Sequence, residues 1–131
     1  MKMLLSNPYL SGVIFGGATI GVVSLWPSKP ALGLLATILG LALGVYIGSF
    51  SYDQRFNKGF QEIVVAVFLM VFIILGFWIS PLYLAAAWLL HPLWDWMHHF
   101  KKVHTRINRW IPPFCGVYDV IVAVYIVVRW F

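Results

Sequence analysis

Charged side chains are scarce in this chain of 131 residues. Asp, Glu, Lys and Arg together make up 10% of the sequence, whereas soluble domains carry about 25% charged residues. Hydrophobic residues account for 62% of the chain, so a folded core could not be covered by a solvated surface. The composition therefore excludes a separate soluble domain and predicts an all-α integral membrane protein.

Acidic residues and cysteine are also few. Four acidic residues oppose nine Lys and Arg, which gives a net charge of +5. A basic chain can indicate nucleic-acid binding, but here no soluble segment could carry such a site. In membrane proteins Lys and Arg more often set the topology and contact anionic headgroups. We therefore expect the lipid bilayer, and not a nucleic acid, as the partner. The single cysteine, Cys115, excludes an intrachain disulfide.

Long apolar segments divide the chain into five predicted spans of one transmembrane domain, 1–131. The spans cover about 10–25, 31–50, 63–79, 81–99 and 114–128. Pro27 and Pro30 separate the first two spans, and the polar stretch 51–61 predicts a loop before the third. Without a break at Pro81, residues 63–99 would form a helix of about 55 Å. That length exceeds the hydrocarbon core of about 30 Å. The sequence therefore predicts a five-span helical bundle.

Basic residues are distributed unevenly between the two sides of such a bundle. Five spans place the termini on opposite sides, and seven of the nine Lys and Arg fall on the side of the N-terminus. The positive-inside rule then predicts a cytoplasmic N-terminus and an outside C-terminus. We expect the protein in the bacterial cytoplasmic (inner) membrane. All four acidic residues and all four histidines belong to the cytoplasmic half, so chemistry is expected at the inner leaflet.

The clearest functional signal is the segment HPLWDWMHH, which ends the fourth span. Helical geometry places His91, Asp95 and His98 or His99 on one face, at i, i+4 and i+7 or i+8. Asp119 lies in the fifth span at a similar depth, and consecutive antiparallel helices pack as neighbours. We therefore expect Asp95 and Asp119 to face each other across this helix pair.

Two carboxylates inside a membrane need compensation, because each costs ~2.5–3.5 kcal/mol at mid-span. A divalent cation or a shared proton would supply it. Imidazole nitrogen with carboxylate oxygen suits zinc, iron or manganese. The predicted metal ligands are His91, Asp95, His98, His99 and Asp119, and Asp95 and Asp119 are also the candidate catalytic bases. Further candidate ligands are Cys115 (which would favour zinc), Glu62 and His104. Tyr118 could donate a hydrogen bond to the site, and the alternative for it is a packed aromatic role.

An alternative interpretation is interfacial. The histidines His98 and His99 would lie at headgroup depth within an aromatic belt of Trp94, Trp96 and Trp110. Asp95 would then simply bond His91, His99 or Tyr118.

Two weaker features concern contacts outside the site. The basic residues of the last loop are expected to contact anionic lipid headgroups: Lys101, Lys102, Arg106 and Arg109. Glycines recur at four-residue spacing, which allows close helix approach: Gly12 with Gly16, Gly17 with Gly21, and Gly40 with Gly44 and Gly48. Such stripes favour packing within the bundle, or a homodimer or larger membrane complex.

The last two spans carry a resemblance. W-D-x-x-H-H, from Trp94 to His99, followed by C-x-x-x-D, from Cys115 to Asp119, resembles a group of small bacterial membrane proteins of unknown function. These proteins carry H-x-x-W-D-x-x-H-H near the end of one span and C-x-x-x-D in the next. The likeness covers about the last 40 residues. More distantly, the x-x-H-H spacing is similar to one histidine box of membrane desaturases and hydroxylases, which carry several boxes and more histidines than this chain.

The leading expectation is a metal-dependent membrane enzyme acting on a lipid or isoprenoid-like substrate. A zinc ion would activate water, with Asp95 or Asp119 as general base, and an iron ion would support oxidation. The first alternative is a non-enzymatic small subunit of a larger membrane complex, with a structural, pigment-binding or haem-binding role. The second is a proton-coupled carrier that uses Asp95 and Asp119 as relay groups.

Overall fold

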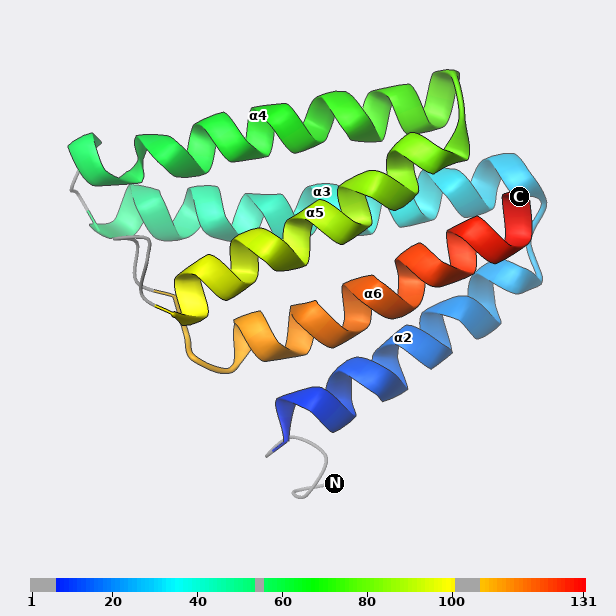
Figure 1. Ribbon diagram of the computed structural model, residues 1–131, viewed down its shortest axis with the longest axis horizontal. Coiled ribbons are helices and arrows are strands. Elements are labelled where there is room, and N and C mark those ends of the chain that lie inside the picture. The colour runs from blue at the N-terminus through cyan, green and yellow to red at the C-terminus, as the bar shows by residue number, and fades with distance from the viewer. Residues whose placement is uncertain (1–6, 54–55, 101–106) are drawn as a thin grey trace.

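The computed structural model describes residues 7–53, 56–100 and 107–131, with the backbone alone for 49–53 and 56–59. Within these ranges the chain forms five helices and no strand (Figure 1): α2 (Pro8–Ser24), α3 (Ser28–Asp53), α4 (Phe56–Trp78), α5 (Pro81–His99) and α6 (Ile111–Trp130). The predicted all-α fold is confirmed. Three helices contain stretches long and apolar enough to cross a membrane, namely Ser28–Gly48, Phe60–Trp78 and Ile111–Trp130.

The helix ends agree with the predicted spans where proline marks them. Asn7 caps α2 by accepting hydrogen bonds from the backbone N–H groups of Tyr9 and Leu10 at 3.0 and 3.3 Å. Ser80 caps α5, and proline occupies the first turn of both helices and of α6. Proline is tolerated there because the first N–H groups of a helix have no intrahelical partner.

The prediction of a loop over 51–61 is wrong for the described residues of that stretch, 51–53 and 56–61, which are helical. Helix α3 continues to Asp53, and α4 begins at Phe56. Polar residues in this stretch indicate where the chain is expected to leave the membrane, but polar residues do not by themselves end a helix. This stretch contains no proline, and Gln, Lys and Arg are compatible with helix. Both helices therefore extend beyond their apolar parts.

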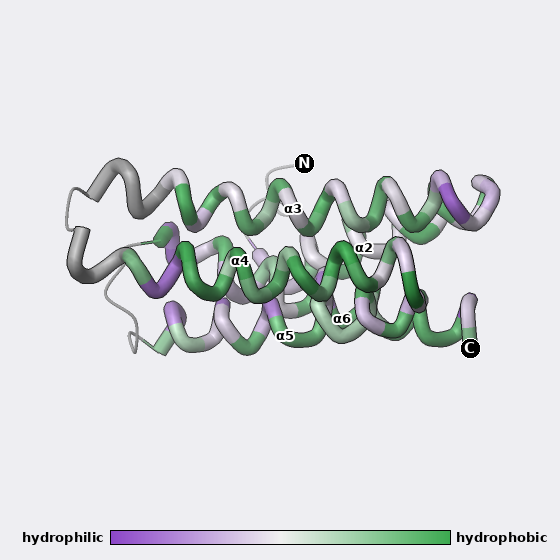
Figure 2. The backbone as a smooth tube through the Cα atoms, turned by 90° about the horizontal axis from the view of Figure 1, so that it is seen from above, coloured by the Kyte–Doolittle hydropathy of each residue, from purple (hydrophilic) through white to green (hydrophobic). Residues whose placement is uncertain are grey.

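The helices alternate in direction, and the start of α2 and the end of α6 lie at opposite ends of the bundle (Figure 1). Helix α6 packs between α5 and α2, while α5 also packs on α4, and α4 on α3. Seen from above, α3 lies on one side of the bundle, and α5 and α6 lie on the other (Figure 2). The core joins these layers through the fully buried side chains of Leu35, Leu39, Leu69, Leu84, Trp88 and Val122.

The outer surface of the bundle is apolar as well. Leu41 is 70% exposed, Phe68 52% and Trp78 78%. Monomeric soluble proteins rarely expose contiguous apolar surface on this scale, so the natural environment of these side chains is lipid. Long apolar helices and this surface together agree with the predicted membrane association.

Two groups of glycines differ in their surroundings. A Cβ atom on Gly12 would lie 2.7 Å from the backbone oxygen of Phe114, and one on Gly16 would lie 3.1 Å from the Ile121 side chain. These two glycines therefore allow α2 to pack closely on α6. By contrast, a Cβ atom would meet nothing within 4 Å at Gly17, Gly21, Gly44 or Gly48. Dimerisation through these open positions stays a prediction.

Candidate metal centre and its polar surroundings

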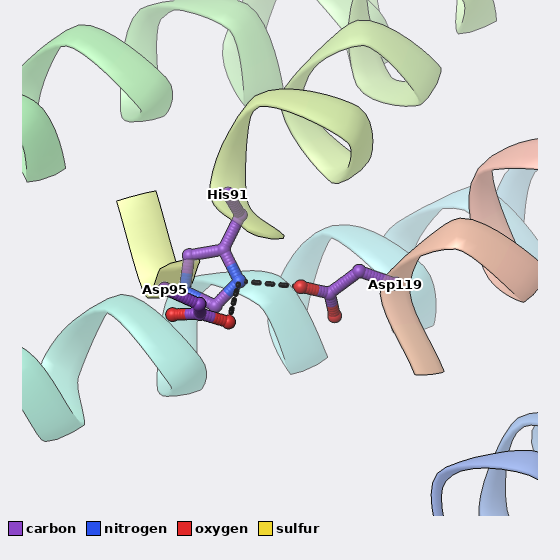
Figure 3. Close-up of side chains that lie close together, drawn as sticks. All are labelled: His91, Asp95 and Asp119. Atoms are coloured by element: carbon purple, nitrogen blue, oxygen red, sulfur yellow. Dashed lines mark hydrogen bonds and ion pairs between the residues drawn. The ribbon is translucent and has the colours of Figure 1, made fainter. Parts of the chain in front are cut away.

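Three polar side chains, two from α5 and one from α6, lie close together (Figure 3). The Nδ1 atom of His91 lies 2.7 Å from Oδ2 of Asp119 and 3.7 Å from Oδ2 of Asp95. All three residues are buried, with at most 1% of their surface exposed. The structure thus brings together the polar groups of the two spans, with His91 in contact with both carboxylates.

Two atoms of this cluster lack a hydrogen-bond partner although they are buried: Nε2 of His91 and Oδ2 of Asp95. A buried polar atom left unpaired costs about 1–3 kcal/mol, and such atoms are rare in native proteins. Both are also strong potential metal ligands. One donor atom from each of His91, Asp95 and Asp119 can be chosen so that all three lie within 4.8 Å of one another. The donor set fits one divalent ion.

Tyr46 of α3 completes the surroundings of Asp95. Its hydroxyl donates a hydrogen bond to Oδ1 of Asp95, and its ring centroid lies 5.7 Å from that of His91 and 4.8 Å from that of His98. Tyr46 was not among the predicted site residues, because it lies in a span that otherwise resembles any apolar helix. The available signal was its helical spacing from the buried residues Leu39 and Leu43.

A second buried cluster lies nearer one end of the bundle. The Nε2 atom of His98 is 2.7 Å from Oε1 of Glu62 on α4, and the Trp94 indole donates to Oε2 of Glu62 at 2.9 Å. The Nδ1 atom of His98 bonds to the Trp94 carbonyl oxygen at 3.0 Å. Both ring nitrogens of His98 are therefore engaged, and neither is free to join the His91 cluster in this structure.

The other predicted site residues lie elsewhere. His99 is exposed, with its ring beside Phe100. Cys115 is partly buried but is not among the three donors that converge, so the argument for zinc based on a thiolate loses its support. The Tyr118 hydroxyl shares a 2.9 Å hydrogen bond with Thr19 on α2, and its ring packs beside Trp88, which agrees with the packed aromatic role and not with donation to the site. The hydrogen bond with Thr19 belongs to the α2–α6 interface.

Only some residues of the predicted basic loop and aromatic belt lie in the described part of the chain. Arg109 is exposed, which leaves its guanidinium available to lipid headgroups. Lys101, Lys102, His104 and Arg106 lie outside the described residues. Trp96 is 49% exposed, as an interfacial residue would be, whereas Trp94 uses its indole to bond Glu62.

The buried charges do not balance by themselves. Three carboxyl groups, those of Glu62, Asp95 and Asp119, face two imidazoles. Even with both imidazoles protonated, the set would carry one net negative charge. Within the described part of the chain, the ion pairs of these carboxylates involve histidine alone, with no Lys or Arg. Additional protons or a bound cation must supply the missing positive charge.

Comparison with curated proteins and with solved structures finds no match for this chain. The distant likeness to desaturases is therefore not shown. A family model does match, and it covers residues 7–130, which is far more than the last 40 residues on which the resemblance was based. The expected membership in a family of unknown function is confirmed, and the chain belongs to the family described as a family of unknown function, DUF6010.

Proposed function

We propose that this protein binds one divalent metal ion inside the membrane, between α5 and α6, with His91, Asp95 and Asp119 as ligands. The observation that carries the proposal is the convergence of three buried donors, two of which, His91 and Asp95, leave a donor atom without a partner. A divalent cation would satisfy these atoms and would neutralise the excess negative charge.

The donor set limits the identity of the metal. One imidazole and two carboxylates suit Fe²⁺, Mn²⁺ or Zn²⁺, whereas a thiolate would have favoured zinc strongly. Because Cys115 lies outside the converging group, the geometry gives no reason to prefer zinc over iron or manganese.

We further propose that the site is catalytic. Structural zinc sites are usually closed by four protein ligands, whereas catalytic sites keep an open position beside three. The three donors here match the catalytic pattern. A metal in this position would supply Lewis-acid activation of a water or of a substrate oxygen.

The protein's own groups would position the ligands. The 2.7 Å contact with Asp119 orients the His91 ring before metal binds, and a bound metal would displace the proton that joins the two ligands. The Tyr46 hydroxyl would fix one oxygen of Asp95 and leave the other oxygen for the metal. Such supporting hydrogen bonds are typical of metal sites. Packing by the neighbouring helices keeps bulk water away.

The substrate class follows from the surroundings. Leu93, Val120 and Val124 face outward from the two helices that carry the site, and each is at least 40% exposed. A reactant that approaches through this apolar surface would have to be lipid-soluble, which favours a lipid or isoprenoid-like molecule. We place the site in the inner half of a bacterial inner membrane, as the distribution of Lys and Arg predicts.

Metal titration tests the proposal. Purified protein in detergent is first stripped with a chelator, then equilibrated separately with Zn²⁺, Fe²⁺ (under anaerobic conditions) and Mn²⁺, and its bound metal is counted. We expect one ion per chain for at least one of these metals, and a large loss of affinity in Asp119→Asn. Failure of the wild-type protein to bind any of the three would overturn the proposal.

A further inference from the structure

The Glu62–His98 pair is not needed to hold the metal, yet it is buried beside the site. His98 is 9% exposed and Glu62 1%. Every polar side-chain atom of the two residues already has a partner, so the pair offers no free ligand for a second metal. A buried ionisable pair inside a membrane is costly and is usually functional.

The hydrogen bonds determine how many protons the pair holds. The carbonyl of Trp94 can only accept, so Nδ1 of His98 must carry a hydrogen, and the Trp94 indole can only donate, so Oε2 of Glu62 accepts. The remaining contact, Nε2 to Oε1 at 2.7 Å, requires one proton between its two atoms. With that proton the pair is neutral, and without it the pair carries one negative charge.

The position of the pair connects the metal site with one end of the bundle. Glu62 lies in the second turn of α4, and His98 is the last residue but one of α5, so both lie toward the end where α4 begins and α5 ends (left in Figure 1). His91 lies seven residues earlier on α5, about 10 Å deeper at 1.5 Å per residue.

Tyr46 contacts both clusters. Its hydroxyl bonds to Asp95, and its ring packs on that of His98. Tyr46 is therefore a titratable residue that lies beside both the pair and the metal site, with its ring on His98 and its hydroxyl on Asp95.

We propose that Glu62 and His98 form a proton-binding site that exchanges protons with the end of the bundle when the metal site fills or empties. This inference rests on the proposed metal function. Metal binding to protein ligands releases protons, and a site enclosed by apolar side chains cannot pass them directly to bulk water. The Glu62 carboxylate, whose oxygens each keep one lone pair, accepts a proton released by the metal ligands. The proton held between Nε2 of His98 and Oε1 of Glu62 then passes to water at the end of the bundle, so the pair holds one proton before and after the event.

Stopped-flow mixing of the stripped protein with Mn²⁺ or Zn²⁺, in weakly buffered detergent solution with a pH indicator, tests this role. Glu62→Gln and His98→Gln remove the exchanging groups, and Trp94→Phe is the matched control, because it removes one hydrogen bond to Glu62 but leaves both titratable groups. We expect all three variants to bind metal with wild-type stoichiometry. Proton release and metal uptake should slow by about 100-fold in the first two variants, the lower end of what a positioned proton donor or acceptor contributes.

Chemical rescue separates proton transfer from a structural role. Added imidazole or formate should restore the rate of the Glu62→Gln and His98→Gln variants and leave Trp94→Phe unchanged. Wild-type rates in both Gln variants, slow rates that no small buffer restores, or complete loss of metal from either variant would overturn the inference. A wild-type protein that binds no metal would instead overturn the proposed function on which it rests.

Discussion

The imidazole of His91 on α5 and the carboxylate of Asp119 on α6 meet at 2.7 Å, although 28 positions separate them in the sequence. Both side chains are essentially inaccessible to solvent. Their contact fixes the relative position of the two helices at mid-bundle. It also orients the ring so that its other nitrogen, Nε2, remains without a hydrogen-bond partner.

Removing the Asp119 carboxylate should destabilise the bundle. Breaking a buried pair by deleting one partner typically costs about 3–5 kcal/mol, because the other partner is left uncompensated. We expect Asp119→Ala to lower the free energy of unfolding in a detergent–SDS titration by about 3 kcal/mol at neutral pH. Asp119→Asn retains an oxygen that can accept from His91, so its loss should be clearly smaller. Equal stability of Asp119→Ala and wild type would contradict this account of the contact.

Tyr46 should tune the metal site without being a ligand. Loss of a hydrogen bond that supports a ligand typically lowers metal affinity by about 10- to 100-fold. We expect this reduction for Tyr46→Phe, with the stoichiometry unchanged at saturating metal, as measured by competition with a chelator. Tyr83→Phe is the control, since Tyr83 is 38% exposed and its ring lies beside Phe72. An affinity equal to wild type in Tyr46→Phe would show that the hydroxyl does not support Asp95.

Gly12 and Gly17 both lie on α2, but their different surroundings predict opposite effects of alanine substitution on stability. In Gly12→Ala the new methyl group would lie 2.7 Å from a backbone oxygen of α6, which cannot move without shifting that helix. In Gly17→Ala it meets nothing within 4 Å, and alanine is favoured in helices by about 1 kcal/mol over glycine. We expect Gly12→Ala to lower the midpoint of thermal unfolding and Gly17→Ala to preserve or raise it. A reversed order would mean that α2 does not pack on α6 as described.

Arg129 should hold the far ends of α2 and α6 together. Its guanidinium donates to the backbone oxygens of Val23 at 2.6 Å and Trp26 at 2.7 Å, and to the Tyr125 hydroxyl at 2.7 Å. Hydrogen bonds from a charged group contribute about 1.5–3 kcal/mol, so Arg129→Gln should destabilise the protein by about 2 kcal/mol. The exposed Arg109→Gln serves as the control in the same SDS titration. Matching stabilities of these two variants would argue against the contact.

The fold was largely predictable because hydrophobicity and proline act locally. The apolar segments gave the number and order of the helices, and Pro27, Pro81 and Pro112 lie within two residues of a helix start. The end of α3 and the start of α4 were placed wrongly, since a polar residue can leave the bilayer and still remain helical. Which helices become neighbours depends on packing in space. The pairing of α2 with α6 was therefore not predicted.

The candidate site was predictable in part for a related reason. Helical spacing and depth placed His91, Asp95 and Asp119 together, because rise per residue is nearly constant. Helical spacing could not predict whether His98 or His99 would be buried, because both fall near the same face. The position of Glu62 on another helix determines that His98 is the buried one. The hydrogen bond from Tyr46 to Asp95 was not predicted, because a tyrosine among apolar residues usually packs as an aromatic side chain.

The most direct test of the account compares two histidines of one helix. Metal content per chain is measured for the purified wild-type protein and for His91→Asn and His99→Asn, all loaded with the same divalent metal. His91 is buried in the cluster, whereas His99 is exposed and outside it. The account predicts a stoichiometric ion in the wild type and in His99→Asn, and its loss in His91→Asn. Metal-free wild-type protein, or full retention of metal in His91→Asn, would contradict it.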